Sequence, residues 1–302
     1  MNLFNKALLS ANPTDSFITP VTPYLICDHF VSTEVYSGDH KYICTSLDLK
    51  GNDLLKHKNY EEIQELDIVQ VQVDHFDFFY DEILPILSKR NISIILITSQ
   101  WHLPQVHISA KTDALLNHKS IHLWISQNPI YSHPKYMAFP YGINHYNINM
   151  YIQFVNHYVP KPKTIKILNQ RSSCHGHLPS NHIRRQYPIF GNDSGPSLAY
   201  WTFLENISNS EFVISTTGDR EDCYRHYESI GIDAIPISNV SANYQDIFDK
   251  NMVYSYAEEM IDMIQNQKIE QDYILPNKDI LTIDYWLYKI HDRLDKLSIN
   301  KE

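Results

Sequence analysis

The chain has 302 residues, of which 43% are hydrophobic and 20% are charged, a composition typical of a globular protein. Its formal net charge is 25 − 35 = −10, which argues against a protein whose main task is to bind nucleic acid or an anionic membrane. No apolar run approaches the roughly 20 residues of a membrane helix. The four cysteines lack CxxC spacing, so we expect reduced thiols in a soluble, cytoplasmic protein.

The first half of the chain alternates apolar segments with polar or helical ones. Short runs rich in Ile and Val predict buried strands at residues 24–27, 42–46, 68–73, 92–98 and 121–125. Apolar residues at helical spacing predict helices at 78–87 and 144–158. This alternation favours a parallel sheet that is covered by helices.

The second half repeats the alternation after residues 159–163, which hold two prolines and two lysines and are the predicted domain linker. Strands are predicted at 164–168, 211–215 and 234–237, and helices at 198–207, 220–230, 244–248 and 257–265. Residues 282–297 carry apolar side chains on one face and predict an amphipathic helix. The pattern therefore predicts two open α/β domains, which bind ligands outside the carboxyl ends of their strands.

The segment 215–238 holds the most informative pattern. Gly218 and Asp219 follow a predicted strand, and Asp219 with Asp222 three residues later resembles a capping box at the start of a helix. The free N–H groups and the dipole of such a helix start suit a phosphate. Arg220 and Arg225 add charges that bind a diphosphate through paired hydrogen bonds.

On the same predicted helix, Glu221, Arg225 and Glu228 form a stripe at i, i+4 and i+7. Glu228 is then placed to accept hydrogen bonds from sugar or ribose hydroxyls beside Arg225. The alternative is a surface ion pair between Glu221 and Arg225 with no further role.

The pattern SEFVISTTGD…R.YESIGIDAIPI resembles the carboxyl-terminal signature of exostosin-like glycosyltransferases, and loosely a fucosyltransferase pattern. It is most similar to small, soluble, virus-encoded members, some of which are xylosyltransferases. The resemblance implies two Rossmann-like domains facing a central cleft (the GT-B arrangement): 1–159 for the acceptor and 160–278 for the donor. Residues 279–302 would form a helix that returns to the first domain.

The resemblance also implies an inverting transfer from a nucleotide-diphosphate sugar, with UDP preferred over GDP and no metal or other cofactor. Arg225 and Glu228 would contact the donor. Its binding site would further include two groups of residues, one following each predicted strand: Arg171, Ser172 and Ser173, and then Thr216, Thr217, Gly218, Asp219, Arg220 and Tyr224. Arg184 is a more distant candidate.

An inverting transfer needs a general base on a first-domain loop that follows a strand. Asp74 is the preferred base because it follows the clearest buried strand, and His29 and Asp28 are the runners-up. The Asp-His-Gly of the family is absent; Trp101 and His102 stand there instead and are expected to line the acceptor pocket, unless Trp101 is core.

A turn and several histidines allow further interpretations. Tyr141, in a Pro-Tyr-Gly turn, is either a cleft-lining hinge or part of a plain turn. Histidine-bearing fragments such as Cys174-His175-Gly176-His177 echo metallophosphoesterase motifs, but in the wrong order. The preferred function is transfer of a sugar, xylose by weak preference, to a glycan hydroxyl. A non-catalytic nucleotide-sugar or glycan-binding protein, and then a metallophosphoesterase, are the alternatives.

Overall fold

The computed structural model describes residues 2–31, 34–36, 42–44, 60–99, 105–173, 178–192 and 198–299. Contacts divide the chain into two compact units: unit 1 holds Met1–Ile18 and Tyr141–Tyr285, and unit 2 holds Thr19–Pro140 and Trp286–Glu302. These bounds differ from the expected domain bounds, because the division falls at 140/141 rather than 159/160 and the first 18 residues group with the second half of the chain.

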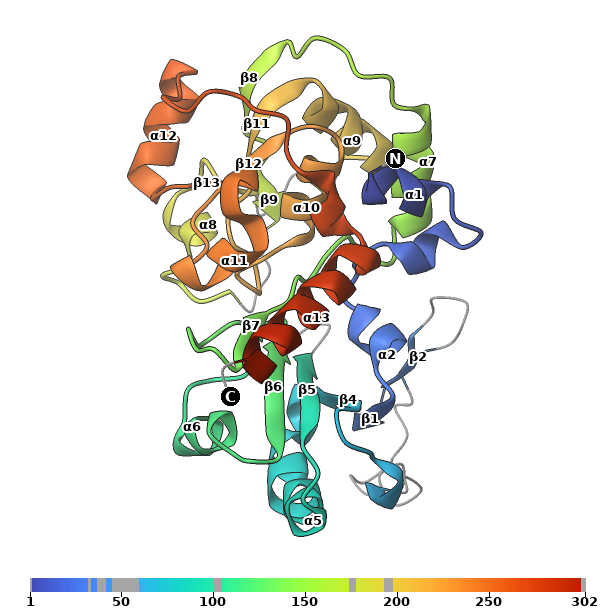
Figure 1. The fold of residues 1–302 in the computed structure, drawn as a ribbon. Helices are drawn as coiled ribbons and strands as arrows, with labels where there is room; N and C mark the ends of the chain where they lie inside the picture. The colour runs from blue at the N-terminus through green and yellow to red at the C-terminus, as the bar shows by residue number, and fades with distance from the viewer. Residues whose placement is uncertain are drawn as a thin grey trace. The chain divides into compact units, whose positions relative to one another are not determined.

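Unit 2 is built on a five-stranded parallel sheet with the order β1-β4-β5-β6-β7 (Figure 1). The strands are β1 (His29–Val31), β4 (Ile68–Gln72), β5 (Ile94–Ser99), β6 (Ile121–Ser126) and β7 (Tyr136–Ala138). All six residues of β5 are buried, as expected for a central strand that is covered on both faces. Val69, Leu96 and Trp124 belong to its hydrophobic core.

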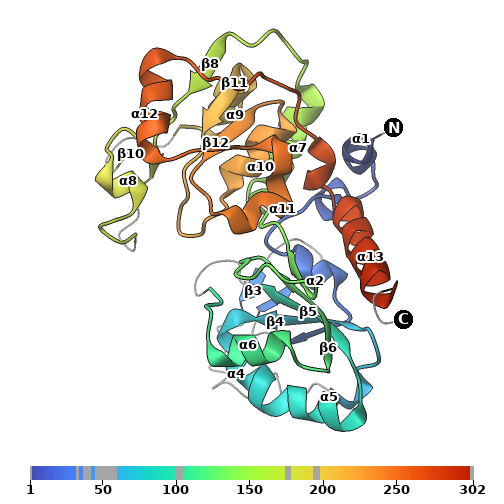
Figure 2. The same cartoon turned by 60° about the vertical axis from the view of Figure 1, so that its left-hand side comes forward.

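The helices of unit 2 pack around this sheet, and Figure 2 shows α5 and α6 beside it. They are α2 (Thr22–Ile26), η2 (Tyr60–Glu62), η3 (Val73–His75), α4 (Phe76–Phe78), the π-helical turn η4 (Phe79–Ile83), α5 (Leu84–Arg90) and α6 (Ala110–Leu116). The segment from η3 to α5 contains the helix predicted at 78–87.

One strand prediction in unit 2 is wrong, and another is confirmed as a strand but not as part of the parallel sheet. Residues 24–27 do not form a strand, because Pro23 in the first turn starts the helix α2. Of the strand predicted at 42–46, residues 42–44 are described: they form β3 (Tyr42–Cys44), which pairs with β2 (Glu34–Tyr36) as an antiparallel ribbon and not within the parallel sheet. The strands predicted at 68–73, 92–98 and 121–125 are confirmed as β4, β5 and β6, with bounds shifted by one or two residues.

Unit 1 contains a four-stranded parallel sheet with the order β13-β12-β11-β8. Its strands are β8 (Ile165–Leu168), β11 (Ser210–Ile214), β12 (Ile235–Ser238) and β13 (Val253–Tyr254). A short parallel pair, β9 (Ser172–Ser173) and β10 (Gly191–Asn192), lies in the same unit. Ile167, Phe212 and Ile237 belong to the core of this unit.

Helices of unit 1 alternate with these strands, and α9 and α10 contact β11 and β12 respectively. The helices are α1 (Leu3–Leu8), η1 (Pro13–Ser16), α7 (Ile148–His157), α8 (Ile183–Gln186), α9 (Tyr200–Ser208), α10 (Tyr224–Gly231), η5 (Ala242–Tyr244), α11 (Gln245–Phe248), η6 (Asp249–Asn251), α12 (Ala257–Asn266) and η7 (Lys278–Leu281). The last helix, α13 (Ile283–Ile299), confirms the helix predicted at 282–297.

Gly142 allows two segments of unit 1 that lie far apart in the sequence to approach closely. Its φ is +90°, and a Cβ at this position would lie 2.3 Å from the carbonyl oxygen of Ile18. Ile143 N–H donates to the same oxygen at 2.9 Å, and Ile18 N–H donates to Leu281 O at 2.8 Å. The amino-terminal segment therefore docks on residues after 140, which explains why contacts assign it to unit 1.

The carboxyl-terminal part of α13 groups with unit 2. Trp286 packs edge-on against Phe139, with ring centroids 5.6 Å apart, and Arg293 Nη2 donates to Tyr136 O at 3.0 Å. The two parallel sheets confirm the mixed α/β class. None of the described helices has both the length and the apolar composition that a membrane span requires.

Candidate functional site

The carboxyl ends of β8, β11 and β12 meet at one edge of the unit 1 sheet, which we call the carboxyl edge. The loops after β11 and β12 are joined there: Thr217 N–H donates to Asn239 Oδ1 at 3.0 Å, and Asn239 Nδ2 donates to Thr217 Oγ1 at 3.0 Å. Open parallel sheets bind ligands at this edge, so its side chains form the candidate site.

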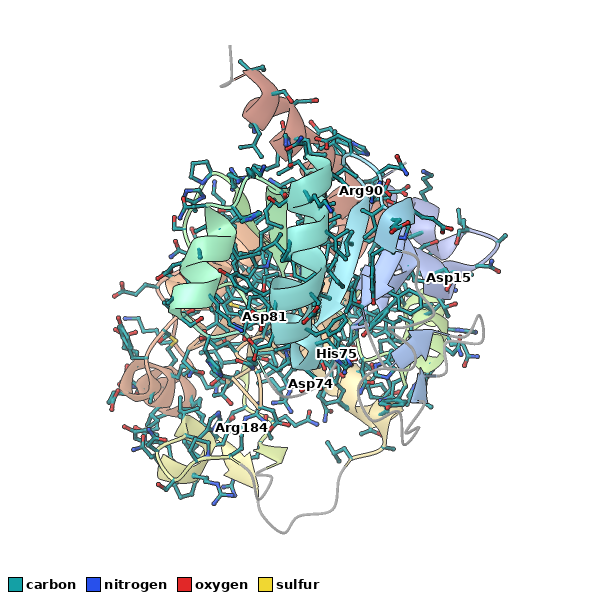
Figure 3. All side chains as sticks on the ribbon, turned by 90° about the horizontal axis from the view of Figure 1, so that it is seen from below. Asp15, Asp74, His75, Asp81, Arg90 and Arg184 are labelled. Carbon is teal, nitrogen blue, oxygen red and sulfur yellow. The ribbon has the colours of Figure 1, made fainter. Side chains whose placement is uncertain are left out.

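Arg184, labelled in Figure 3, lies on α8 and contacts the carboxyl edge directly through the loop after β11. Its Nε donates to Thr216 Oγ1 at 3.0 Å and its Nη2 to Thr216 O at 2.7 Å, and the residue is 9% exposed. A Cβ on Gly218 would lie 3.2 Å from Nη2. The glycine therefore leaves room for the guanidinium, a contact that spacing along the chain did not reveal.

Arg225, on the first turn of α10, joins the ends of two strands. Its Nη1 donates to Gln170 O at 2.6 Å and to Ile214 O at 3.4 Å, and its guanidinium lies 5.4 Å from the ring centroid of Phe203. Burial lowers the pKa of Arg225 to about 10. The side chain therefore remains a cation near neutral pH.

Glu228 lies one turn further along α10 and is 3% exposed. Tyr200 Oη donates to its Oε1 at 2.6 Å. Burial raises the pKa of Glu228 to about 7, although the hydrogen bond from Tyr200 and the charge of Arg225 both act to lower it. The carboxyl group therefore titrates near neutral pH, and Tyr200 is a partner that the sequence analysis missed.

The predicted start of this helix is wrong. α10 begins at Tyr224 rather than at residue 220, and Cys223, not Asp219, is its N-cap. Cys223 N–H donates to His226 Nδ1 at 3.1 Å, and the backbone N–H of His226 donates back to Cys223, to its carbonyl oxygen at 3.0 Å and to its sulfur. His226 Nε2 lies 2.7 Å from Ser215 O and donates to it, because a carbonyl oxygen only accepts.

This capping box occupies the N–H groups of Cys223 and His226, so the observed start of α10 differs from the free helix start that the sequence analysis expected near Asp219. It was missed because cysteine and histidine are uncommon in the two positions. Glu221 precedes the helix, so the predicted stripe of three residues is also wrong. Its Oε2 accepts a hydrogen bond from Ser241 N–H at 2.7 Å.

Asp222 is fully buried and forms a hydrogen bond with the backbone of Tyr141, which belongs to the same unit. Its Oδ2 accepts hydrogen bonds from Tyr141 N–H at 2.9 Å and Tyr227 Oη at 2.7 Å, and burial raises its pKa. The Arg220 guanidinium lies 4.6 Å from the ring centroid of Tyr141, and the ring of Tyr224 stacks on Tyr141 at 5.1 Å. Tyr141, predicted for the acceptor side, thus packs among predicted donor-binding residues.

The predicted donor-binding residues after β8 differ in their exposure to solvent. Arg171 is exposed, whereas Ser172 is buried and its N–H donates to Phe190 O at 2.9 Å. The backbone of Ser173 lies in β9. Asp219 is partly buried, next to Gly218.

Asp74 lies in unit 2 where the sequence analysis expects it, in η3 directly after the carboxyl end of β4. It is exposed, and Gln72 Nε2 donates to its Oδ2 at 3.3 Å. Figure 3 shows Asp74 and His75 at the opposite end of the η3–α5 segment from Arg90. Burial lowers the pKa of His75, and the charge of Asp74 opposes this shift.

Asp28 and His29 do not follow a strand. They precede or begin β1, and therefore lie at the amino ends of the unit 2 strands. Asp28 Oδ2 accepts a hydrogen bond from Ile68 N–H at 2.9 Å, and His29 Nε2 lies 3.0 Å from Asp67 Oδ2. Asp28 and His29 therefore do not have the position after a strand on which their choice as alternative general bases depended. Trp101 and His102 lie outside the described residues.

Within the described ranges, no three His, Cys, Asp or Glu residues group in a way that could hold a metal ion. The Cys174-His175-Gly176-His177 fragment lies outside those ranges.

These features define the class as a mixed α/β protein with two larger parallel sheets among the described residues, one of which carries arginines at its carboxyl edge. No protein-family model and no curated protein matches the sequence. Nine chains of solved structures match the fold. One of them, from the crystal structure of the GtfA/B complex, is 10% identical with a TM-score of 0.40 over 78% of this chain. The match covers 59% of that chain, so this protein spans less than two thirds of its length.

Proposed function

We propose that the protein is an inverting glycosyltransferase that uses a nucleotide-diphosphate sugar, with UDP as the nucleotide and xylose as the weakly preferred sugar. The acceptor is a hydroxyl of a glycan. The donor binds at the carboxyl edge of unit 1, and the transfer uses arginines in place of a divalent cation.

One observation carries the proposal: Arg184 and Arg225 both contact residues at the carboxyl edge of a parallel sheet, and Arg220 lies in the loop after β11. Two of them bond to strand-end backbone or side-chain oxygens, Arg184 at Thr216 and Arg225 at Ile214 and Gln170. Guanidinium groups in fixed orientations suit the paired oxygens of a diphosphate. They stabilise the negative charge that grows on the diphosphate as it leaves.

In the proposed reaction, the oxygen of the acceptor hydroxyl attacks the anomeric carbon of the sugar. The bond from that carbon to the phosphate oxygen breaks, and the electron pair departs with the nucleoside diphosphate. Asp74 takes the hydroxyl proton, as its exposed carboxylate after β4 permits. Glu228 accepts hydrogen bonds from ribose or sugar hydroxyls.

The test compares two adjacent arginines of α8. Arg184→Gln and Arg185→Gln remove the same charge from neighbouring positions, but Arg184 is buried on Thr216 whereas Arg185 is exposed. We expect wild-type protein to bind UDP in isothermal titration calorimetry without added divalent cation. Arg184→Gln should weaken binding by about 10-fold or more, as expected when a charged hydrogen bond is lost, and Arg185→Gln by less than about 2-fold.

Equal effects of the two variants would contradict the assigned site. Donor binding with no transfer and no hydrolysis, across a panel of glycan acceptors, would instead identify a non-catalytic nucleotide-sugar-binding protein. Arg225→Ala should also abolish binding. Because it leaves the Gln170 and Ile214 carbonyls without their donor, its fold is checked by circular dichroism.

A further inference from the structure

The loop after β8 presents two amide side chains at the carboxyl edge. Asn169 Nδ2 donates to Ile189 O at 2.9 Å, which fixes the orientation of the amide because a flipped amide would face one oxygen with another. Asn169 Oδ1 is buried and accepts no hydrogen bond from any described residue. Among the described residues, the acceptor atom of this amide therefore has no donor.

Gln170 has the same feature one residue later. Its side-chain Oε1 is buried and has no hydrogen-bond partner among the described residues. Its backbone oxygen, in contrast, accepts from Arg225 Nη1 at 2.6 Å. The hydrogen bond from Arg225 thus fixes the backbone at Gln170, from which this side chain extends.

Most buried hydrogen-bond acceptors in proteins have a donor from protein, water or ligand. A buried acceptor that lacks a donor destabilises the folded protein. Here two such acceptors occur at consecutive residues, at the edge of the sheet where parallel α/β proteins bind their ligands. Both are neutral carbonyl oxygens, so they suit O–H or N–H donors and not the oxygens of a phosphate.

We infer that Asn169 Oδ1 and Gln170 Oε1 accept hydrogen bonds from hydroxyl groups of the transferred sugar, and that they select among nucleotide sugars. The inference rests on the proposed function. Arg225, assigned to the diphosphate, donates to the backbone oxygen of Gln170, so the backbone of this loop lies next to that charge. The sugar is bonded directly to the diphosphate and offers several hydroxyl donors, whereas the nucleobase is separated from it by the ribose.

Gln170→Met provides the sharpest test. Methionine is unbranched and similar in length, it removes the side-chain oxygen, and it keeps the backbone oxygen that Arg225 holds. The measurements are the Kd values of wild type and variant for UDP and for UDP-xylose, UDP-glucose, UDP-galactose and UDP-N-acetylglucosamine. We expect the Kd for UDP to change by less than about 2-fold, and the Kd for the best-bound UDP-sugar to rise about 3- to 10-fold.

The melting temperature of unliganded protein supplies an independent readout. Replacing an unsatisfied buried oxygen by an apolar group should leave the melting temperature of Gln170→Met equal to or above that of wild type. Asn169→Leu is the second variant; it should show the same selective loss for UDP-sugars, with a lower melting temperature because Ile189 O loses its donor.

The outcomes separate this inference from the proposed function. If both variants weaken UDP and UDP-sugars equally, or leave all Kd values unchanged while wild type binds them, the sugar contact is refuted and the proposed function stands. If wild type binds neither UDP nor any UDP-sugar, the proposed function fails and the inference fails with it.

Discussion

Glu228→Gln should make the protein more stable at alkaline pH. Glutamine keeps an oxygen that accepts the hydrogen bond from Tyr200 Oη, now 2.6 Å from Oε1, but it has no charge to desolvate. Burial raises the pKa of Glu228 from 4.5 to about 7. The substitution therefore removes one specific cost, that of ionising a carboxyl group inside the folded protein.

The expected change in the free energy of unfolding follows from this upward shift of the pKa. One pH unit of pKa displacement corresponds to about 1.4 kcal/mol, so the ionised carboxylate costs the folded state roughly 3 kcal/mol. Since the folded-state pKa of Glu228 lies above its unfolded value, its favourable contribution is complete below about pH 4.5 and is lost as the pH rises through about 7. Wild type loses this contribution, and Glu228→Gln does not.

The assay is urea unfolding, followed by tryptophan fluorescence, at pH 5, 6, 7 and 8. Relative to wild type, the free energy of unfolding of Glu228→Gln should rise from pH 5 to pH 8 by roughly 1–3 kcal/mol. Glu205→Gln, at an exposed carboxylate of α9, is the matched control and should show no such rise. If the difference between Glu228→Gln and wild type is the same at all four values, the argument from burial is refuted.

Three further predictions test the packing and the proposed chemistry. Gly231→Ala should lower the free energy of unfolding by more than about 2 kcal/mol in urea titrations, because its Cβ would lie 1.8 Å from Tyr151 Oη; Tyr151→Phe should restore part of the loss, and no rescue would contradict the clash. Gly218→Ala meets only the flexible end of Arg184 at 3.2 Å, so its melting temperature should stay close to that of wild type while UDP affinity in calorimetry falls; unchanged affinity would separate this contact from the donor site. Asp74→Asn should keep the Kd for UDP-sugar but lower transfer at least about 100-fold, the usual scale of general base catalysis; unchanged turnover would move the base elsewhere.

Periodicity alone predicted much of the architecture. Runs of Ile and Val predicted β4, β5 and β6 in unit 2 and β8, β11 and β12 in unit 1, because a strand covered on both faces must be apolar at successive positions. The spacing of Trp286, Ile290 and their neighbours likewise predicted α13. These features depend on residues close together in the chain, which is why local patterns were sufficient.

The sequence also singled out Arg225 and Glu228 as candidate site residues, from their type and their spacing on one helix. Only the tertiary structure decided what each contacts. Arg225 bonds to a carbonyl 55 residues away in the sequence, and Glu228 pairs with Tyr200 on another helix. Arg184 reaches Thr216 across 32 residues.

Local patterns were misleading where a competing local interaction determined the element. Pro23 turned an apolar strand pattern into α2, and the Cys223–His226 capping box moved the start of α10 past Asp219. The grouping of residues 1–18 with those after 140 depended on hydrogen bonds between Ile18, Ile143 and Leu281. The sequence thus determined the elements and the chemical groups, whereas folding decided their partners, because hydrogen bonds and burial join residues whose separation along the chain carries no periodic signal.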